Sequence, residues 1–190
     1  MITVTMLNAQ TRTASADGPW NSSTTWGGQP VPTSANDVVI NPGVDVTLAS
    51  GANAQCNSMT FTTSGTNTTA STLSISSGFT VSVTGAITLN NAAGNSRSAS
   101  ITGAGTVTAG SVIIGGTNTS PTSDASTTFT SSVAVFSITG DISVNGEDNG
   151  GSENNAVFNL GSGALSAVSI TLDSDNDDND ATATFSLDNG

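Results

Sequence analysis

Carboxylate side chains crowd into one stretch near the C-terminal end of the chain. Five aspartates fall between residues 173 and 180, and Asp173, Asp175 and Asp177 occupy alternate positions within it. Oxygens placed in this way could converge on one Ca²⁺, which takes about six to eight hard oxygen ligands. The stretch lacks the central glycine and closing glutamate of an EF-hand loop, and a solvated acidic turn explains the same residues. Calcium is therefore a candidate ligand and not a required cofactor.

A second acidic group precedes Phe158. Glu147, Asp148 and Glu153 lie close together in the sequence, beside Asn149. They form a weaker calcium candidate, because fewer carboxylates are available there. If both acidic groups leave adjacent turns of one fold on the same side, they form an acidic ridge.

The remaining carboxylates do not suggest catalysis. Asp37, Asp45, Asp124 and Asp141 are isolated in the sequence. Cleavage of a sugar chain needs acids held at a defined separation, often with a cationic or histidine partner. The chain contains no histidine and no lysine, so we expect a protein that is not an enzyme.

Cys56 is the single cysteine. It excludes an intrachain disulfide and a cysteine-based metal site, and its alternating apolar neighbours indicate a small buried hydrophobe.

Two tryptophans lie in a segment rich in Gly, Pro and Asn. Trp20 and Trp26 stand between Gly18 and Pro32, where regular structure is disfavoured. The favoured interpretation is a cap that covers the open apolar end of a stacked core, since such cores need their first layer shielded. The alternative is an aromatic platform for a sugar ring, which would make the protein a carbohydrate-binding module.

Threonines recur at outward positions of several expected strands, and a regular array of them could match an ice lattice. The two sets are Thr80, Thr84 and Thr88, and Thr102, Thr106 and Thr108. Their spacing is irregular, so ice binding ranks below the sugar alternative.

Charge excludes several partners. Fourteen acids stand against two arginines, for a formal net charge of −12. Binding to a nucleic-acid backbone or an anionic lipid surface needs clustered cations, so neither is expected. No apolar run approaches the roughly 20 residues of a membrane span, and we expect no membrane insertion. The lysine-free, Thr/Ser/Asn-rich composition is typical of an extracellular protein.

The elements that position these residues are short strands. From Val38 onward apolar residues alternate with polar ones, and Gly or Asn separates runs of three to five residues. Such strands fit the rungs of a parallel β-solenoid, in which each turn of about 20 to 30 residues stacks on the previous one. At the N-terminal end, Ile2, Val4 and Met6 alternate and predict a strand, whereas residues 11–15 offer little to anchor one.

A short motif recurs along the chain and supports stacked turns: Phe or Leu, a small polar residue, an aliphatic residue and, further on, Gly. Its copies are Leu73–Gly78, Phe136–Gly140, Phe158–Gly163 and Phe185–Gly190. Phe136, Phe158 and Phe185 lie 22 and 27 residues apart, and we expect their rings to form one internal ladder. The last copy of the motif begins at Phe185 and contains Leu187. It stops where other copies start a new strand, so either the chain continues into further turns or Phe185 and Leu187 form an assembly edge for head-to-tail stacking.

The opening third of the chain resembles secreted bacterial β-helix surface and adhesin-like proteins, and it is similar to the start of the G8 domain. The residues that carry this resemblance are Trp20–Ser23, Thr25–Gly28, Pro32, Asp37–Ile40, Val44–Leu48 and Cys56–Phe61. The resemblance implies a right-handed parallel β-helix that is exported to the cell exterior, with roles in adhesion, matrix or surface layers.

We therefore expect an all-β protein with one solenoid domain over residues 1–190. Residues 1–36 would form an N-terminal strand and the Trp-containing cap, and residues 37–190 the rungs. The expected function is that of a structural protein on the cell surface: an adhesin stalk, a matrix or surface-layer component, or a filament subunit. The expected partners are further copies or neighbouring domains of a longer chain, with glycans as the alternative.

Overall fold

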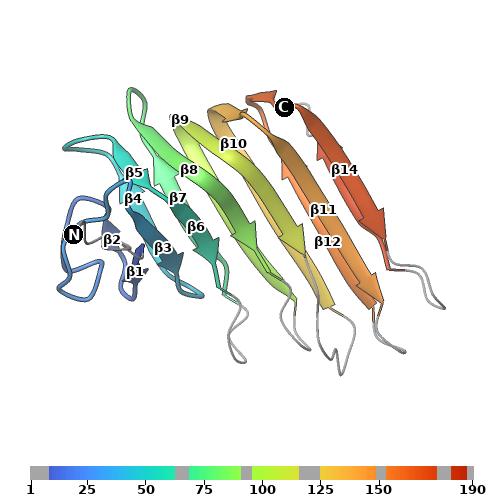
Figure 1. Cartoon of the computed structure of the whole chain (residues 1–190), viewed down its shortest axis with the longest axis horizontal. Coiled ribbons are helices and arrows are strands. Elements are labelled where there is room, and N and C mark those ends of the chain that lie inside the picture. The colour runs from blue at the N-terminus through green and yellow to red at the C-terminus, as the bar shows by residue number, and fades with distance from the viewer. Residues whose placement is uncertain are drawn as a thin grey trace, which may run out of the picture.

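The protein is a parallel β-solenoid of about five turns (Figure 1), and we describe it from a computed structural model. The structure describes residues 9–62, 69–90, 96–115, 125–148, 153–174 and 181–187. Within these ranges every regular element is a β-strand, so the all-β, stacked architecture expected from the alternating pattern is confirmed. In the same ranges, no helix has the length and apolar character needed to cross a membrane.

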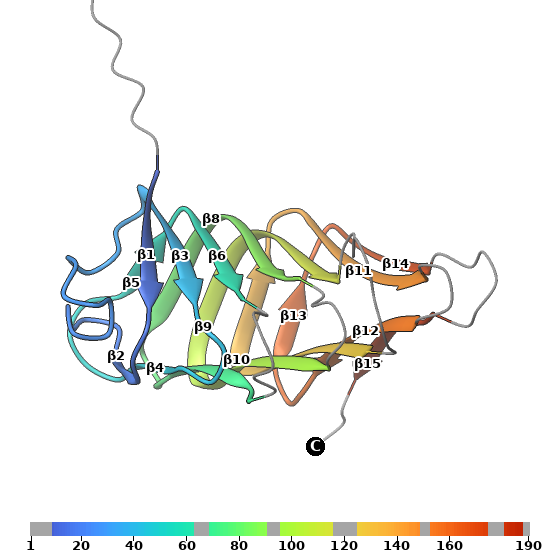
Figure 2. The same ribbon diagram turned by 90° about the horizontal axis from the view of Figure 1, so that it is seen from below.

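The strands form three faces around a common interior (Figure 2). Three strands bend around corners and contribute to more than one face: β8 (Thr80–Leu89), β9 (Arg97–Gly115) and β10 (Ala125–Ile138). The first face contains β1 (Gln10–Ala14), β3 (Asn36–Ile40), β6 (Ser58–Phe61), the last parts of β8 and β9, β11 (Asp141–Asp148) and β14 (Ser169–Ser174).

The second and third faces follow in the same order around each turn. The second face contains β2 (Gly18–Pro19), β4 (Asp45–Leu48), β7 (Ser71–Ile75), the first parts of β9 and β10, β12 (Glu153–Leu160) and β15 (Ala183–Leu187). The third face contains β5 (Ala54–Cys56), the first part of β8, the middle of β9, the last part of β10 and β13 (Ala164–Ser166).

The register of the ladders fixes the length of each turn. Asp37 pairs with Ser58 and Val112 pairs with Ile142; these offsets of 21 and 30 residues are the shortest and longest among the described parallel pairings. All pairings among the described strands are parallel except at one corner, where the end of β11 runs antiparallel to the start of β12. Parallel pairing of consecutive turns is what the short alternating strands predicted.

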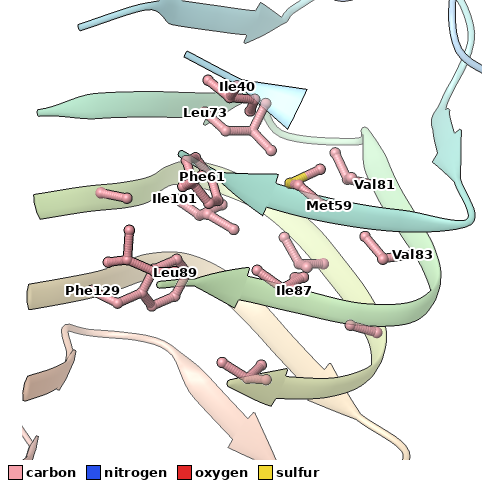
Figure 3. Close-up of a cluster of buried hydrophobic side chains, with 14 of the residues drawn as sticks. Ile40, Met59, Phe61, Leu73, Val81, Val83, Ile87, Leu89, Ile101 and Phe129 are labelled. Atoms are coloured by element: carbon pink, nitrogen blue, oxygen red, sulfur yellow. The ribbon is translucent and has the colours of Figure 1, made fainter. Parts of the chain in front are cut away.

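Alternate residues of strands β3 to β9 enter the interior, and Figure 3 shows one cluster of these buried side chains. On the first face Met59, Ile87, Val112 and Ile142 form one stacked column, and all four side chains are buried. Neighbouring side chains from the three faces meet in one continuous apolar core. Burial of this core is the main stabilising term, because the outward positions carry mostly Ser and Thr.

Gly103 shows why glycine stands at a corner. Its φ is +104°, and a Cβ built there would collide with the backbone oxygen of Ile75 in the preceding turn. Both the backbone conformation and the close approach therefore require a residue without a side chain.

Two sequence-based expectations about the elements were wrong. Residues 10–14 form β1, although they carry few apolar side chains, because the neighbouring β3 supplies a complete ladder and Ala14 enters the core. The three-membered phenylalanine ladder was also wrong. Phe158 pairs with Phe129 and Phe185 on the second face, whereas Phe136 lies on the third face and reaches Phe158 across the interior, with ring centroids 6.1 Å apart.

Candidate functional site

The C-terminal end of the solenoid is the clearest candidate interaction surface. Five large apolar residues are exposed among those described, and four of them lie on or beside the last two strands, β14 and β15. These four are Val168, Ile170, Leu172 and Leu187, with exposed fractions of 74%, 40%, 50% and 68%. The fifth, Val135, is 40% exposed and lies on the third face.

The register explains why these side chains are exposed. Ile170 pairs with Ile142 and Leu172 with Val144, and both of these partners are fully buried. Ile170 and Leu172 thus continue inward-facing columns, but no described strand stacks on them. Their exposure comes from their position at the end of the coil and not from an outward orientation.

The predicted assembly edge, Phe185 and Leu187, belongs to this surface. Phe185 pairs with Phe158, with ring centroids 5.3 Å apart, and it is half-buried. Leu187 pairs with Leu160 and remains largely exposed. Within the described residues β14 pairs only with β11, and β15 only with β12, so each has one edge without a backbone partner.

The opposite end of the coil differs in chemistry. Trp20 and Trp26 follow β2, and their rings are both buried and meet edge to face, with centroids 4.9 Å apart. The Trp26 Nε1 donates a hydrogen bond of 2.7 Å to the backbone oxygen of Trp20. Neither ring presents a face to solvent, which a sugar platform would require. Around them the loop exposes polar and small residues, including Asn21, Thr24 and Gln29.

Arg12 occupies an inward-facing position at this same end. It pairs with Val38 at the start of the column that continues through Met59. Its guanidinium nitrogens donate to Gln29 at 3.2 Å and to Gln10 at 2.9 Å. This column therefore begins with the cation Arg12 at the N-terminal end of the coil and ends with Ile170 at the C-terminal end.

The calcium candidate is only partly within the described structure. Asp173 lies on β14 with its side chain exposed, whereas Asp175 and Asp177 lie outside the described residues. In the part of the chain that the structure describes, no three acidic, histidine or cysteine side chains gather as metal ligands would. In the second acidic group, the backbone of Asp148 pairs with that of Glu153 at the antiparallel corner, and Asn149 lies outside the described residues.

Single carboxylates serve as hydrogen-bond acceptors between turns. Asp37 accepts from Asn57 at 2.8 Å and from Ser58 at 2.7 Å, and both donors belong to the next turn. Asp141 likewise accepts from Ser169 at 2.7 Å. Asp45 lies on β4, and Asp124 is outside the described residues. Asp37 and Asp141 therefore connect neighbouring turns through side-chain hydrogen bonds.

Cys56 is buried on the third face. Burial, reinforced by the negative charge of Asp37, raises the pKa of its thiol to about 12. The thiolate is the nucleophile and the metal ligand, so Cys56 remains an inert core residue at neutral pH, as its apolar neighbours indicated.

The threonines that suggested an ice-binding array do not share one plane. Thr80 and Thr106 pair on the third face. Thr88 lies on the first face, and Thr102 lies on the second, where its hydroxyl is 3.1 Å from that of Ser74. Hydroxyls on different faces cannot contact one flat lattice together.

Comparison with protein-family models, with curated proteins and with solved structures found no match for this chain. Sequence reasoning named Phe185 and Leu187 at the apolar end but missed Ile170 and Leu172. The signal for them was present, since both lie in the alternating run that follows Leu165.

Proposed function

We propose that this protein is a rigid structural spacer that works outside the cell as part of a stalk, matrix or surface layer. One observation carries the proposal: parallel ladders on three faces enclose one apolar core that extends from the tryptophans to β12. Each turn adds about 4.8 Å along the coil axis. Such a coil holds two attached parts at a fixed separation.

The composition supports a mechanical role over a chemical one. Asp37 and Asp141 accept hydrogen bonds from neighbouring turns, and the only thiol is buried and neutral. The extracellular setting is supported by the absence of lysine and by the resemblance of the opening third to secreted β-helix proteins.

The tryptophan segment fits the role of a cap within this proposal. Trp20 and Trp26 are part of the core, and the side chain of Asn21 donates to the backbone oxygens of Ser50 and Ala52 at 2.6 and 3.2 Å. These bonds tie the loop to the next turn. A loop held in this way shields the first apolar layer and gives the rod a water-compatible end.

Single-molecule pulling between the two ends tests the spacer. A spacer that unfolds turn by turn should give steps of one turn each, which is about 70 to 100 Å of extended chain for 21 to 30 residues. A smooth extension without steps, like that of an unfolded chain, would show that the coil bears no load and would contradict the proposed spacer.

A further inference from the structure

Cationic side chains are rare in this chain, and both of them lie in β-strands. The two are Arg12 on β1 and Arg97 on β9, and the chain has no lysine. Proteases of the trypsin type cut after Arg or Lys, because an aspartate in their specificity pocket binds the cation. We propose that the folded coil resists such proteases, because both of its arginines occupy inward positions in paired strands.

Arg97 is the better protected of the two arginines. Only 4% of its surface is exposed, and it stands at the start of β9, two residues before the buried Ala99. Its backbone pairs with Thr127 of the next turn, and the following residue, Ser98, pairs with Thr128. A protease needs the substrate as an extended strand with the recognised side chain in its pocket. Binding at Arg97 therefore requires that β9 separate from β10 and that the guanidinium leave the core.

Arg12 is held less firmly. It is half-buried on β1, where it pairs with the fully buried Val38. Its guanidinium donates hydrogen bonds to Gln29 at 3.2 Å and to Gln10 at 2.9 Å. Among the described strands β1 pairs only with β3, so it should open more readily than β9, which has partners on both edges. A cut after Arg12 would leave all later turns in one covalent piece.

The connections between strands offer no further site to such a protease. Loops are the preferred places of proteolytic cutting, and several connections here run from the first face to the second. The stretches between the strands that they join contain neither Arg nor Lys: residues 62–70, 90–96, 116–124, 149–152 and 175–182. A trypsin-type protease must therefore open a paired strand before it can cut.

Trypsin digestion of the native and the urea-unfolded chain tests the proposal, with a short arginine peptide to correct for the activity of trypsin in urea. Both arginines should be cut in urea. Native protein should be cut after Arg97 on the order of 1000-fold more slowly, because only transiently opened molecules are substrates. Mass spectrometry identifies the cut bond, and the cut after Arg12 should appear first. Equal rates after Arg97 in native and unfolded protein would overturn the proposal.

Two lysine substitutions at exposed positions separate the placement of the cations from a general rigidity of the coil. Ser34 is exposed in the turn that precedes β3. Thr47 is also exposed, but it lies on β4 between Pro19 of β2 and Ser74 of β7. Native Ser34→Lys should be cut at least on the order of 10-fold faster than wild type, because its lysine lies outside the paired strands. Thr47→Lys should remain as resistant as wild type.

Two further results would overturn the proposal, once circular dichroism has shown that both variants are folded. If trypsin does not cut native Ser34→Lys, the resistance does not depend on where the cations lie. If it cuts both variants equally fast, strand pairing gives no protection. The proposal is independent of the mechanical role, because a coil that fails the pulling experiment could still resist trypsin.

Discussion

Ser131 is a buried polar residue in an apolar column. It lies on the second face between Ile101 and Leu160, its side chain is fully buried, and its Oγ has no hydrogen-bond partner. An unsatisfied buried hydroxyl costs roughly 1 to 3 kcal/mol. We expect Ser131→Ala to raise the free energy of unfolding by about 1 kcal/mol in a urea titration.

Ser71 provides the matched control for this prediction. It is also buried and inward-facing on the second face, but its Oγ donates to the backbone oxygen of Asn41 at 2.9 Å. Ser71→Ala should therefore lower the free energy of unfolding by about 1 kcal/mol. Equal effects of the two substitutions would show that hydrogen bonding does not distinguish the two sites.

Because of Cys56, we expect the free energy of unfolding to depend on pH in the alkaline range. Burial and Asp37 raise the thiol pKa from 9.0 to about 12. Between these values the unfolded chain loses the proton and the folded chain keeps it, so the free energy of unfolding falls as pH rises. The chain has no Tyr or His, and both of its cationic side chains are arginines, so no other side chain is expected to titrate in this window.

We expect the free energy of unfolding to fall by up to about 1.4 kcal/mol for each pH unit between pH 9 and 12. Denaturant titrations across this range measure the slope. Cys56→Ala should abolish it, apart from any general loss of stability. A slope that persists in Cys56→Ala would assign the pH dependence to another group.

At the scale of elements, the sequence predicted the period of the strands better than their grouping into faces. Alternation depends on side-chain direction within one strand, and it correctly predicted short strands from Val38 onward that pair in parallel between turns. Assigning a strand to a face depends on corners and loops of variable length, so Phe136 was placed with Phe158 although they lie on different faces.

The candidate surface shows the same limit. Its apolar residues were visible as an alternating pattern, but their exposure depends on whether another strand covers them, and no local pattern encodes that. The pattern also failed at β1, which has few apolar side chains. Its backbone pairing with β3 holds it in place instead. The sequence therefore predicts which side chains point inward, but only the assembled turns show which of them another strand covers.

The loop that contains Trp26 should stabilise the first turn more than the others. Trp26→Ala removes a buried ring from the core and the hydrogen bond to Trp20. A deletion of this size typically lowers the free energy of unfolding by about 3 to 5 kcal/mol. In a solenoid each turn contacts only its neighbours, so hydrogen exchange should quicken in β1 and β3 and remain slow in β10 and β12.

Trp26→Phe separates the ring from its N–H group. It keeps most of the aromatic volume and loses the bond to the backbone oxygen of Trp20, so we expect a smaller effect, of about 1 to 3 kcal/mol. Uniformly faster exchange along the whole coil in Trp26→Ala would show that the turns unfold as one unit and that the segment does not act as a local cap.

At the scale of the whole molecule, we expect the core of the solenoid to be stable without a bound ion. The described interior is mostly apolar, and hydrogen bonds and backbone ladders connect its turns. We therefore expect the midpoint of thermal unfolding to be the same in EDTA and in excess calcium. Circular dichroism melts in the two conditions measure this, with magnesium as the control for general screening of the −12 charge.

A specific calcium site would produce a different pattern. Calcium would raise the midpoint where magnesium does not, since a ligand that binds only the folded state stabilises it in proportion to its occupancy. Asp173→Asn would then reduce the rise, because it removes a candidate ligand on β14. Because Asp173 is exposed on β14, such an ion would bind at the C-terminal end of the coil. A calcium-dependent midpoint in wild type that is lost in Asp173→Asn would thus contradict an ion-independent coil and place the ion at its C-terminal end.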